Sequence, residues 1–261
     1  MQIKFLIEKL KLFIALERLK RCPRHTPGKI KINDWIIHYV DNRSLISNIE
    51  ILVQRKTNNF ISSISNPYII DCGANIGISV LNYKRLYPKA EIIAFEPDPN
   101  LAEILRINLK ANEIIDIQIV EAAVWIKDGS VPFFLEGTDG GRVNFQDHTL
   151  KNTEVAAVEL GRYLIKRVDL LKMDIEGAEF VILPAIAEKL SYVKNILIEC
   201  HMDMSKIEDF ANLLSVLGKA GFSCSVNTYG PWRDLIHSPT KLPVEFDQYI
   251  LVCGWKNEPS E

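Results

Sequence analysis

The sequence lacks the features that mark membrane-spanning and secreted proteins. No stretch reaches the roughly 20 consecutive apolar residues that a membrane-spanning helix needs. Lysines interrupt the first apolar residues and no small-residue cleavage site follows, so we expect no signal peptide. The five cysteines are scattered and never spaced C-x-x-C, which indicates neither a disulfide framework nor a zinc site. We therefore expect a protein of the reducing cytoplasm.

An excess of charge of one sign is also lacking. The 31 lysines and arginines nearly balance the 33 aspartates and glutamates, and the formal net charge is −2. Bulk electrostatics therefore give no reason to expect nucleic-acid binding. The balance is uneven along the chain, because nine basic residues stand against two acidic ones in residues 1–31. Apolar residues at spacings of three and four predict a basic amphipathic helix over residues 2–20.

Two interpretations of this helix remain open. It would rest on the anionic inner surface of a membrane as a peripheral contact, or it would pack against its own domain or a second copy of the chain. We favour packing, because Phe5, Leu6, Phe13 and Leu19 spread the apolar residues around the helix. The sequence leaves the oligomeric state open.

The rest of the chain alternates between short apolar runs and stretches with helical periodicity. This alternation predicts a doubly wound, Rossmann-like α/β fold with a parallel sheet covered on both faces. We expect residues 1–30 to form an N-terminal helical extension and residues 31–261 to form one domain, with an extended segment at 31–41 and a helix over 43–56. The expected strands lie at residues 68–72, 91–95, 117–124, 168–173, 195–200 and 247–252.

The first of these strands runs into a glycine turn. Residues 71–77 read D-C-G-A-N-I-G, and a helical pattern follows. Gly73 and Gly77 allow a tight turn and close approach of a ligand, which is typical of nucleotide-cofactor sites. Asp71 would repel the pyrophosphate of a dinucleotide, which argues against a nicotinamide-dependent dehydrogenase. It suits a cofactor that carries an ammonium and a sulfonium group.

A second carboxylate ends the next strand. Residues 92–98 read I-I-A-F-E-P-D, and Glu96 stands where a carboxylate can accept hydrogen bonds from two ribose hydroxyls. The alternative is that Asp71 caps the following helix and Glu96 begins a turn at Pro97. We favour the cofactor interpretation, because both carboxylates stand at cofactor positions in the right order.

Five motifs together resemble the FkbM-type family of S-adenosylmethionine-dependent methyltransferases. The resemblance extends from residue 45 to residue 253 and is most specific at K-M-D-I-E-G-A-E. The motifs are D-C-G-A-N-I-G at 71–77, F-E-P-D at 95–98, E-A-A-V at 121–124, L-L-K-M-D-I-E-G-A-E at 170–179 and I-E-C-H at 198–201.

The resemblance implies a class I methyltransferase fold, in which a seven-stranded sheet has an antiparallel last strand. It implies S-adenosylmethionine as cofactor and methylation of a hydroxyl on a sugar, a glycolipid or another secondary metabolite. By the same resemblance, the methionine end of the cofactor would be lined by Asp71, Gly73, Asn75 and Gly77, the ribose by Glu96, and the adenine by Glu121, Ala122 and Ala123. We also expect Pro97 and Asp174 to lie at the cofactor.

The acceptor is expected at the carboxyl ends of the fourth and fifth strands. Lys172, Asp174 and Glu176 alternate, so all three would point to one face while the chain remains extended. We expect Lys172 and Glu176 to contact the acceptor. A hydroxyl group must lose its proton to a base, and His201 is the natural candidate because its unperturbed pKa lies near neutrality. Glu199 or Asp174 would orient His201 or act instead.

Other roles for these side chains remain open. His201 would otherwise begin a helix and bond to backbone, and Glu179 would only stabilise the first turn of its helix. Asp174 and Glu199 are suitable ligands for a hard divalent cation, although we favour a reaction without metal.

Two long connections are expected to select the acceptor. Residues 126–166 contain two strand-like pieces around several glycines, and residues 227–246 carry aromatic and basic side chains at Tyr229, Trp232 and Arg233. These side chains would contact a sugar ring, or Trp232 would only close its loop onto the domain. Two functions compete with O-methylation: N-methylation of an amine, and cofactor binding by a non-catalytic module.

Overall fold

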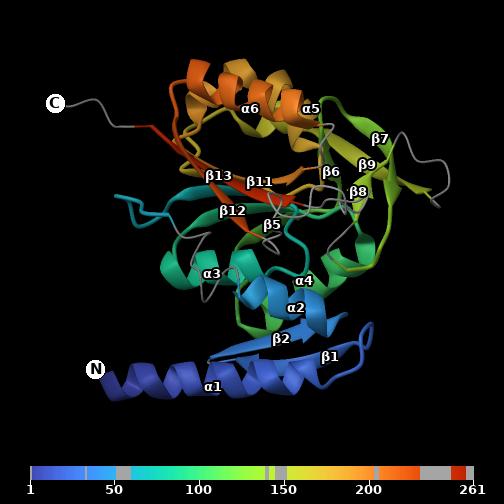
Figure 1. Ribbon diagram of the computed structural model, residues 1–261, viewed down its shortest axis with the longest axis vertical. Helices are drawn as coiled ribbons and strands as arrows, with labels where there is room; N and C mark the ends of the chain where they lie inside the picture. The colour runs from blue at the N-terminus through green and yellow to red at the C-terminus, as the bar shows by residue number, and fades with distance from the viewer. Residues whose placement is uncertain are drawn as a thin grey trace, which may run out of the picture.

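Figure 1 shows a computed structural model of the chain. The structure describes residues 2–32, 34–50, 60–138, 141–144, 152–202, 206–229 and 248–256. Within these ranges, no helix combines the length and the apolar character needed to cross a bilayer. The five cysteines, all of which fall in these ranges, have free thiols.

A seven-stranded sheet forms the centre of the molecule, with the strand order β12-β13-β11-β10-β3-β4-β5. The strands from β11 to β5 are parallel to one another, and β13 runs antiparallel to both β11 and β12. This arrangement confirms the predicted α/β fold with an antiparallel last strand. The strands are β3 (Tyr68–Cys72), β4 (Glu91–Phe95), β5 (Ile117–Val120), β10 (Leu170–Met173), β11 (Asn195–Met202), β12 (Ser223–Tyr229) and β13 (Gln248–Trp255).

Helices cover both faces of the sheet (Figure 1), with α5 (Glu179–Ala185) and α6 (Ile207–Lys219) on one face and α3 (Ile78–Leu86) and α4 (Pro99–Ala111) on the other. Successive residues of a strand point to opposite faces, so Ile69 and Ile70 belong to different hydrophobic clusters. Both side chains are fully buried, and each such burial contributes about 1.5–3 kcal/mol. This burial on both faces explains why the strands are continuous apolar runs.

A second, smaller sheet has the order β6-β9-β7-β8 and lies beside the central sheet (Figure 1). The strand expected at residues 117–124 is wrong as a single strand, because the chain turns at Glu121 and continues as β6 in the smaller sheet. The amide of Ala122 donates to the carbonyl of Val120 at 2.9 Å within this turn. The strand-like pieces expected in residues 126–166 are confirmed as β7 and β9. The strands are β6 (Ala123–Trp125), β7 (Gly129–Phe134), β8 (Arg142–Val143) and β9 (Asn152–Glu159).

The N-terminal residues form a further layer against α4 (Figure 1). It consists of α1 (Gln2–Lys20), β1 (Gly28–Ile32), β2 (Trp35–Tyr39) and α2 (Asn42–Ile49). The single extended segment expected at residues 31–41 is wrong, because β1 and β2 form an antiparallel pair with Ile32 opposite Trp35. The helix expected over residues 43–56 corresponds to α2, and residues 51–59 lie outside the described ranges.

The predicted N-terminal helix is confirmed, and part of it packs against its own chain. Ala15, Leu16 and Leu19 are buried in the hydrophobic cluster that also contains Ile69 of β3. Leu10 and Phe13 remain exposed. From Leu10 onward, the apolar side chains on one side of α1 are buried in the core and others are exposed to solvent.

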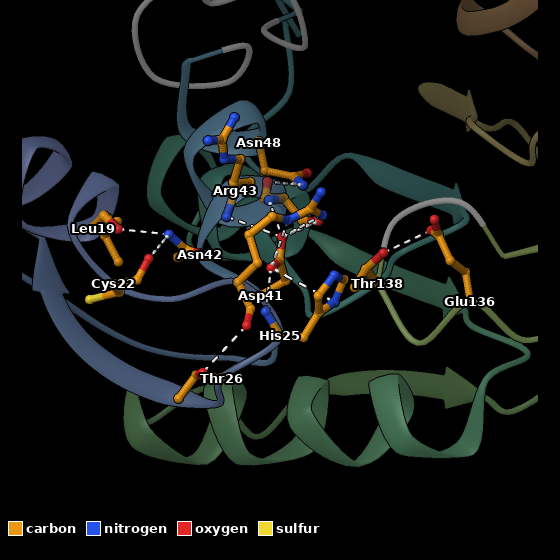
Figure 2. A network of polar contacts seen from close by, with 12 residues as sticks. Leu19, Cys22, His25, Thr26, Asp41, Asn42, Arg43, Asn48, Glu136 and Thr138 are labelled. Carbon is orange, nitrogen blue, oxygen red and sulfur yellow. Dashed lines mark hydrogen bonds and ion pairs between the residues drawn. The ribbon is translucent and has the colours of Figure 1, made fainter.

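A buried carboxylate joins the loop after α1 to α2 (Figure 2). Asp41 caps α2 by accepting hydrogen bonds from the amides of Arg43 and Ser44 at 3.1 and 3.0 Å. Arg24 and the amide of His25 also donate to it. Burial opposes ionisation, but Arg24 and the backbone amides of His25 and Ser44 hold the pKa of Asp41 well below its usual range. The charged form of Asp41 therefore organises this corner.

Asn108 of α4 and Asn112, which follows the last residue of α4, bind the free edge of β2. The side chain of Asn108 accepts from the amide of His38 at 2.6 Å and donates to its carbonyl at 3.0 Å. Asn112, one helical turn later, makes the same pair of bonds to Ile36 at 2.9 and 2.8 Å. Asn108 also donates to the carbonyl of Ile76 at 2.8 Å, so the hairpin is connected to the glycine turn.

Candidate active site

The glycine turn connects β3 to α3 and packs against the residue after β10 and against α4. Gly73 has φ +80°, and a Cβ added to it would overlap the backbone carbonyl oxygen of Asp174. Gly77 has φ +89°, and a Cβ there would overlap the side chain of Leu105 on α4. The tight turn is confirmed. Contacts inside the protein require glycine at both positions. The sequence suggests a different reason, which is close approach of a ligand.

Asp71 lies at the same end of β3 and is fully buried. Ser79 donates to its Oδ2 at 2.5 Å, and the ammonium of Lys172 lies 3.1 Å from its Oδ1. Lys172 also donates to the carbonyl of Gly73 at 3.1 Å and lies 3.5 Å from Asp174 Oδ2. Burial opposes the charge on Lys172, but Asp71 and Asp174 raise the pKa of this ammonium. Asp71 therefore forms a buried ion pair with a residue of the neighbouring strand.

The alternative role of Asp71 as a helix cap is wrong. The cap position of α3 is occupied by Gly77, and no side chain makes a capping hydrogen bond there. Sequence reasoning placed Lys172 at the acceptor, but in the structure it is buried beside Asp71. A contact between Lys172 and an acceptor stays a prediction.

Glu96 occupies the predicted place at the carboxyl end of β4. Its Oε2 accepts a hydrogen bond from the amide of Asn75 at 2.8 Å, and its Oε1 accepts one from the amide of Asp98 at 2.9 Å. The residue is 5% exposed, and burial raises the pKa of its carboxyl to about 7. Each oxygen of a carboxylate can accept more than one bond, so Glu96 keeps acceptor capacity for a ligand.

Asn75 joins the glycine turn to two other segments. Its backbone has φ +51°, a left-handed conformation that asparagine tolerates well. Its side chain donates to the carbonyl of Thr138 at 2.9 Å, in the loop after β7. Figure 2 shows Thr138, whose hydroxyl donates to Glu136 at 2.7 Å. No local sequence motif marks Thr138, because its loop reaches the glycine turn from the smaller sheet only in the folded chain.

The expected adenine residues lie where the chain passes from β5 to β6. The carboxylate of Glu121 pairs with Arg106 of α4 at 2.8 Å. Ala122 and Ala123 are buried, and Pro97 is partly exposed beside Glu96. Contacts of these residues with adenine stay predictions.

A second polar group lies at the carboxyl ends of β10 and β11. Asp174, Glu176 and His201 each bring one ligand atom within 4.8 Å of the other two. Nε2 of His201 lies 3.2 Å from Glu176 Oε1, and Nδ1 lies 3.7 Å from Glu179 Oε1. We call these four residues the strand-end cluster. Glu199 precedes His201 by two residues on β11. It is not one of the three residues whose ligand atoms lie within 4.8 Å of one another.

The two alternatives proposed for this end of the sheet have different outcomes. His201 belongs to β11, six residues before the start of α6, so the idea that it begins a helix is wrong. Glu179 is the first residue of α5, as predicted, and its Oε1 accepts from the amide of Ile175 at 3.1 Å in the turn before the helix. Stabilisation of the first helical turn by its charge stays a prediction. Glu179 also contacts His201, a relation that only the folded chain shows.

Burial and charge oppose each other in the strand-end cluster. Burial lowers the pKa of His201, but Glu176 and Glu179 outweigh it and raise that pKa well above its ordinary value. Burial also raises the pKa of Glu176, while His201 opposes this shift. The side chain of Asp174 is 31% exposed, which makes it the most accessible carboxylate of the cluster to an incoming molecule.

The three expected acceptor residues Tyr229, Trp232 and Arg233 belong to the end of β12 and the connection to β13. The backbone of Tyr229 ends β12. Its side chain, together with Trp232 and Arg233, lies outside the described residues. Their contacts with an acceptor therefore stay predictions.

The strand order and the antiparallel last strand define the class I methyltransferase fold. Residues 71–224 match the family of the Methyltransferase FkbM domain. The chain belongs to this family, as the five motifs predicted.

Relatives and a solved structure agree with this assignment. Methyltransferase sdnD of Sordaria araneosa is 30% identical over 172 residues, covering 52% of this chain and 66% of that protein. The 2-O-methyltransferase NoeI of Sinorhizobium fredii (strain NBRC 101917 / NGR234) is 26% identical over 155 residues, covering 51% of this chain and 63% of that protein. The chain thus spans just under two thirds of these relatives. A crystal structure of Methyltransferase FkbM from Methylobacillus flagellatus KT has a TM-score of 0.51 and 13% identity, covering 92% of this chain and 58% of that one, and shares the fold.

Proposed function

We propose that the protein is an S-adenosylmethionine-dependent O-methyltransferase that acts on a hydroxyl of a sugar, a glycolipid or a secondary metabolite. The observation that carries this proposal is the link between the glycine turn and Glu96, whose carboxylate is held by the amide of Asn75 at 2.8 Å. Family membership and the name of the relative NoeI, a 2-O-methyltransferase, support it.

The residues at the first two strand ends fit this cofactor. Glu96 would accept hydrogen bonds from the ribose hydroxyls with the acceptor capacity that its two backbone bonds leave. Bound there, S-adenosylmethionine supplies a methyl group that is already activated on a sulfonium. Asp71 would act at a distance, because its carboxylate is buried and paired with Lys172.

The groups at β10 and β11 would serve the acceptor. A hydroxyl held in line with the methyl group needs its proton removed. A positioned base contributes on the order of 10²–10⁴-fold in rate. Asp174 and His201 lie together at this end, and Asp174 adjoins the glycine turn through the contact of its carbonyl with Gly73. Asp174, His201 or Glu199 would receive or orient the proton.

Calorimetric titration with S-adenosylmethionine and with its demethylated product tests cofactor use. We expect both to bind the wild-type protein, and we expect Glu96→Gln to bind them at least tenfold more weakly, because hydrogen bonds to a charged group contribute about 1.5–3 kcal/mol. Glu103→Gln, which changes an exposed carboxylate of α4, is the matched control and should bind both ligands as the wild type does. Absence of binding in the folded wild-type protein would overturn the proposal.

Turnover separates the competing functions. A panel of glycosides and their amino-sugar analogues, assayed for formation of the demethylated cofactor, should give product with the hydroxyl compounds. Product with amines alone would indicate N-methylation. Tight cofactor binding with no product across the panel would favour the non-catalytic module.

A further inference from the structure

We propose that Asp174, Glu176 and His201 form a binding site for a divalent transition-metal cation, with Mn²⁺ as the best-suited probe. Two carboxylates and one imidazole form a mixed oxygen and nitrogen donor set. Such a set suits Mn²⁺, Fe²⁺ and Zn²⁺ better than Mg²⁺, which prefers oxygen ligands alone. Binding of the cation does not depend on the proposed function, but its role in catalysis rests on that function.

The distances suit a common cation. Ligand atoms that bind one metal at about 2.1 Å lie about 3.0 Å apart when they are neighbours in an octahedron. His201 Nε2 and Glu176 Oε1 are 3.2 Å apart. Asp174 brings its ligand atom within 4.8 Å of both, so a small rotation of this partly exposed side chain would complete a three-ligand face.

Glu179 supplies an independent observation. This carboxylate is fully buried, its Oε1 lies 3.7 Å from Nδ1 of His201, and its Oε2 has no hydrogen-bond partner among the described residues. Burying a carboxylate costs several kcal/mol, and the single hydrogen bond from Ile175 to Oε1 does not satisfy Oε2. Metal-binding histidines usually direct their second nitrogen at a carboxylate, which fixes the ring and makes it a better ligand. Glu179 stands in that position relative to His201, which leaves Nε2 for the metal.

The site lies next to the place proposed for the methyl donor. The carbonyl of Asp174 contacts Gly73 so closely that a Cβ on this glycine would overlap it. The side chains of Asp174, Glu176 and His201 are 31%, 21% and 14% exposed. With only three protein ligands, coordination positions remain for water or for acceptor oxygens.

The cation would activate the acceptor hydroxyl. A metal-bound hydroxyl is more acidic, so its proton would pass to water or to a neighbouring carboxylate. The oxygen would then form a bond to the methyl carbon as the bond from this carbon to sulfur breaks. The products are a methyl ether, the neutral thioether cofactor and one proton. His201 would act as a ligand here and not as the base.

Manganese binding is measured directly by electron paramagnetic resonance of free Mn²⁺ titrated with the full chain. We expect saturable loss of the free-ion signal with one Mn²⁺ per chain. His201→Gln and Asp174→Asn should each weaken binding at least tenfold. Glu179→Gln, a change in a positioning residue, should weaken it about tenfold, as expected for a residue outside the first coordination shell. Glu188→Gln removes an exposed carboxylate of the helical turn η3 (Ala187–Tyr192) and should leave binding unchanged.

Two results would overturn the proposal. In the first, the wild-type protein leaves the signal of free Mn²⁺ unchanged. In the second, His201→Gln and Asp174→Asn both bind Mn²⁺ as tightly as the wild type does. Circular dichroism identifies any variant that fails to fold. Asp174→Asn keeps the test valid if the more buried His201 variant is unstable. If either result overturns the metal site, the cluster is an ion pair of His201 with Glu176 and Glu179.

Failure of this proposal can be distinguished from failure of the proposed function. The same samples are titrated with S-adenosylmethionine in EDTA. Cofactor binding without manganese binding overturns the metal site alone, and manganese binding without cofactor binding overturns the proposed function alone.

Discussion

The β3–β4 end and the β10–β11 end of the candidate site differ in what holds their polar groups. At the first end, backbone amides hold the carboxylate: Glu96 accepts from Asn75 and Asp98. At the second, side chains hold one another, since His201 lies between Glu176 and Glu179. Backbone groups are placed by the fold itself, so the first end is built before any ligand arrives.

This difference has a consequence for specificity. An arrangement made by backbone hydrogen bonds tolerates few changes, because it depends on turn conformation and strand pairing. An arrangement made by side chains can vary with single substitutions while the sheet stays intact. Under the proposed function, the first end suits the cofactor and the second suits the acceptor.

The largest effect is expected from Asp71→Asn. It leaves the buried ammonium of Lys172 without its closest carboxylate, and breaking a buried ion pair costs about 3–5 kcal/mol of unfolding free energy. Asp174→Asn removes a carboxylate that is partly exposed and 3.5 Å from Lys172, and should cost about 1 kcal/mol or less. Guanidinium unfolding monitored by circular dichroism measures both. Equal losses would show that the partly exposed contact of Asp174 with Lys172 contributes as much as the buried pair.

A smaller effect is expected from alanine at two glycines with positive φ. Gly73→Ala places a Cβ against the backbone carbonyl of Asp174 and should cost about 3 kcal/mol. Gly177→Ala, with φ +99°, places its Cβ 3.0 Å from the flexible end of Lys206. Its cost should be about 1 kcal/mol, from backbone strain alone. Denaturant midpoints compare them, and a Gly177 variant as unstable as the Gly73 variant would show that strain outweighs packing.

The smallest effect is a pH dependence of cofactor affinity, which rests on the proposed function. Burial raises the pKa of Glu96 to about 7, and ribose hydroxyls donate to the ionised form. Affinity should therefore rise as pH increases towards 7, by up to about tenfold per pH unit, and level off above it. Calorimetry from pH 5.5 to 8.5 measures this.

Glu96→Gln is the control for this pH dependence, because it cannot ionise. Its weaker binding should vary little across the same range, and a profile that keeps the wild-type slope would assign the titration to another group. The stability of the wild type carries the opposite sign. Since the pKa of Glu96 is raised by folding, its contribution to stability is present below the unfolded pKa and is lost as pH rises through about 7.

Several parts of the site could be predicted because they are local in sequence. Asp71 and Glu96 follow apolar strands directly, so their place at the strand ends could be read from the pattern. The burial of Asp71 against Lys172 could not, because it depends on β3 and β10 becoming neighbours in the sheet. The same holds for Thr138, which reaches Asn75 from the smaller sheet.

The structure also changed the interpretation of single residues. His201 was weighed as the start of a helix, but pairing of β11 with β13 extends the strand beyond it, with His201 opposite Tyr249. Glu179 is predicted to lie at the start of its helix, and it is the first residue of α5 while its carboxylate also contacts His201. Local spacing shows the first of these facts and only the folded chain shows the second.

The sequence by itself determined the α/β class, the positions of most central strands along the chain and the carboxylates at their ends, because hydrophobic periodicity and turn residues act over short distances. Only the tertiary structure decided why the glycines are needed and which polar groups meet. Gly73 is required by the carbonyl of Asp174, and the strand-end cluster joins residues of two strands and a helix. Such contacts depend on how the parallel strands are ordered and how the helices pack over them, which is set by burial of the whole core.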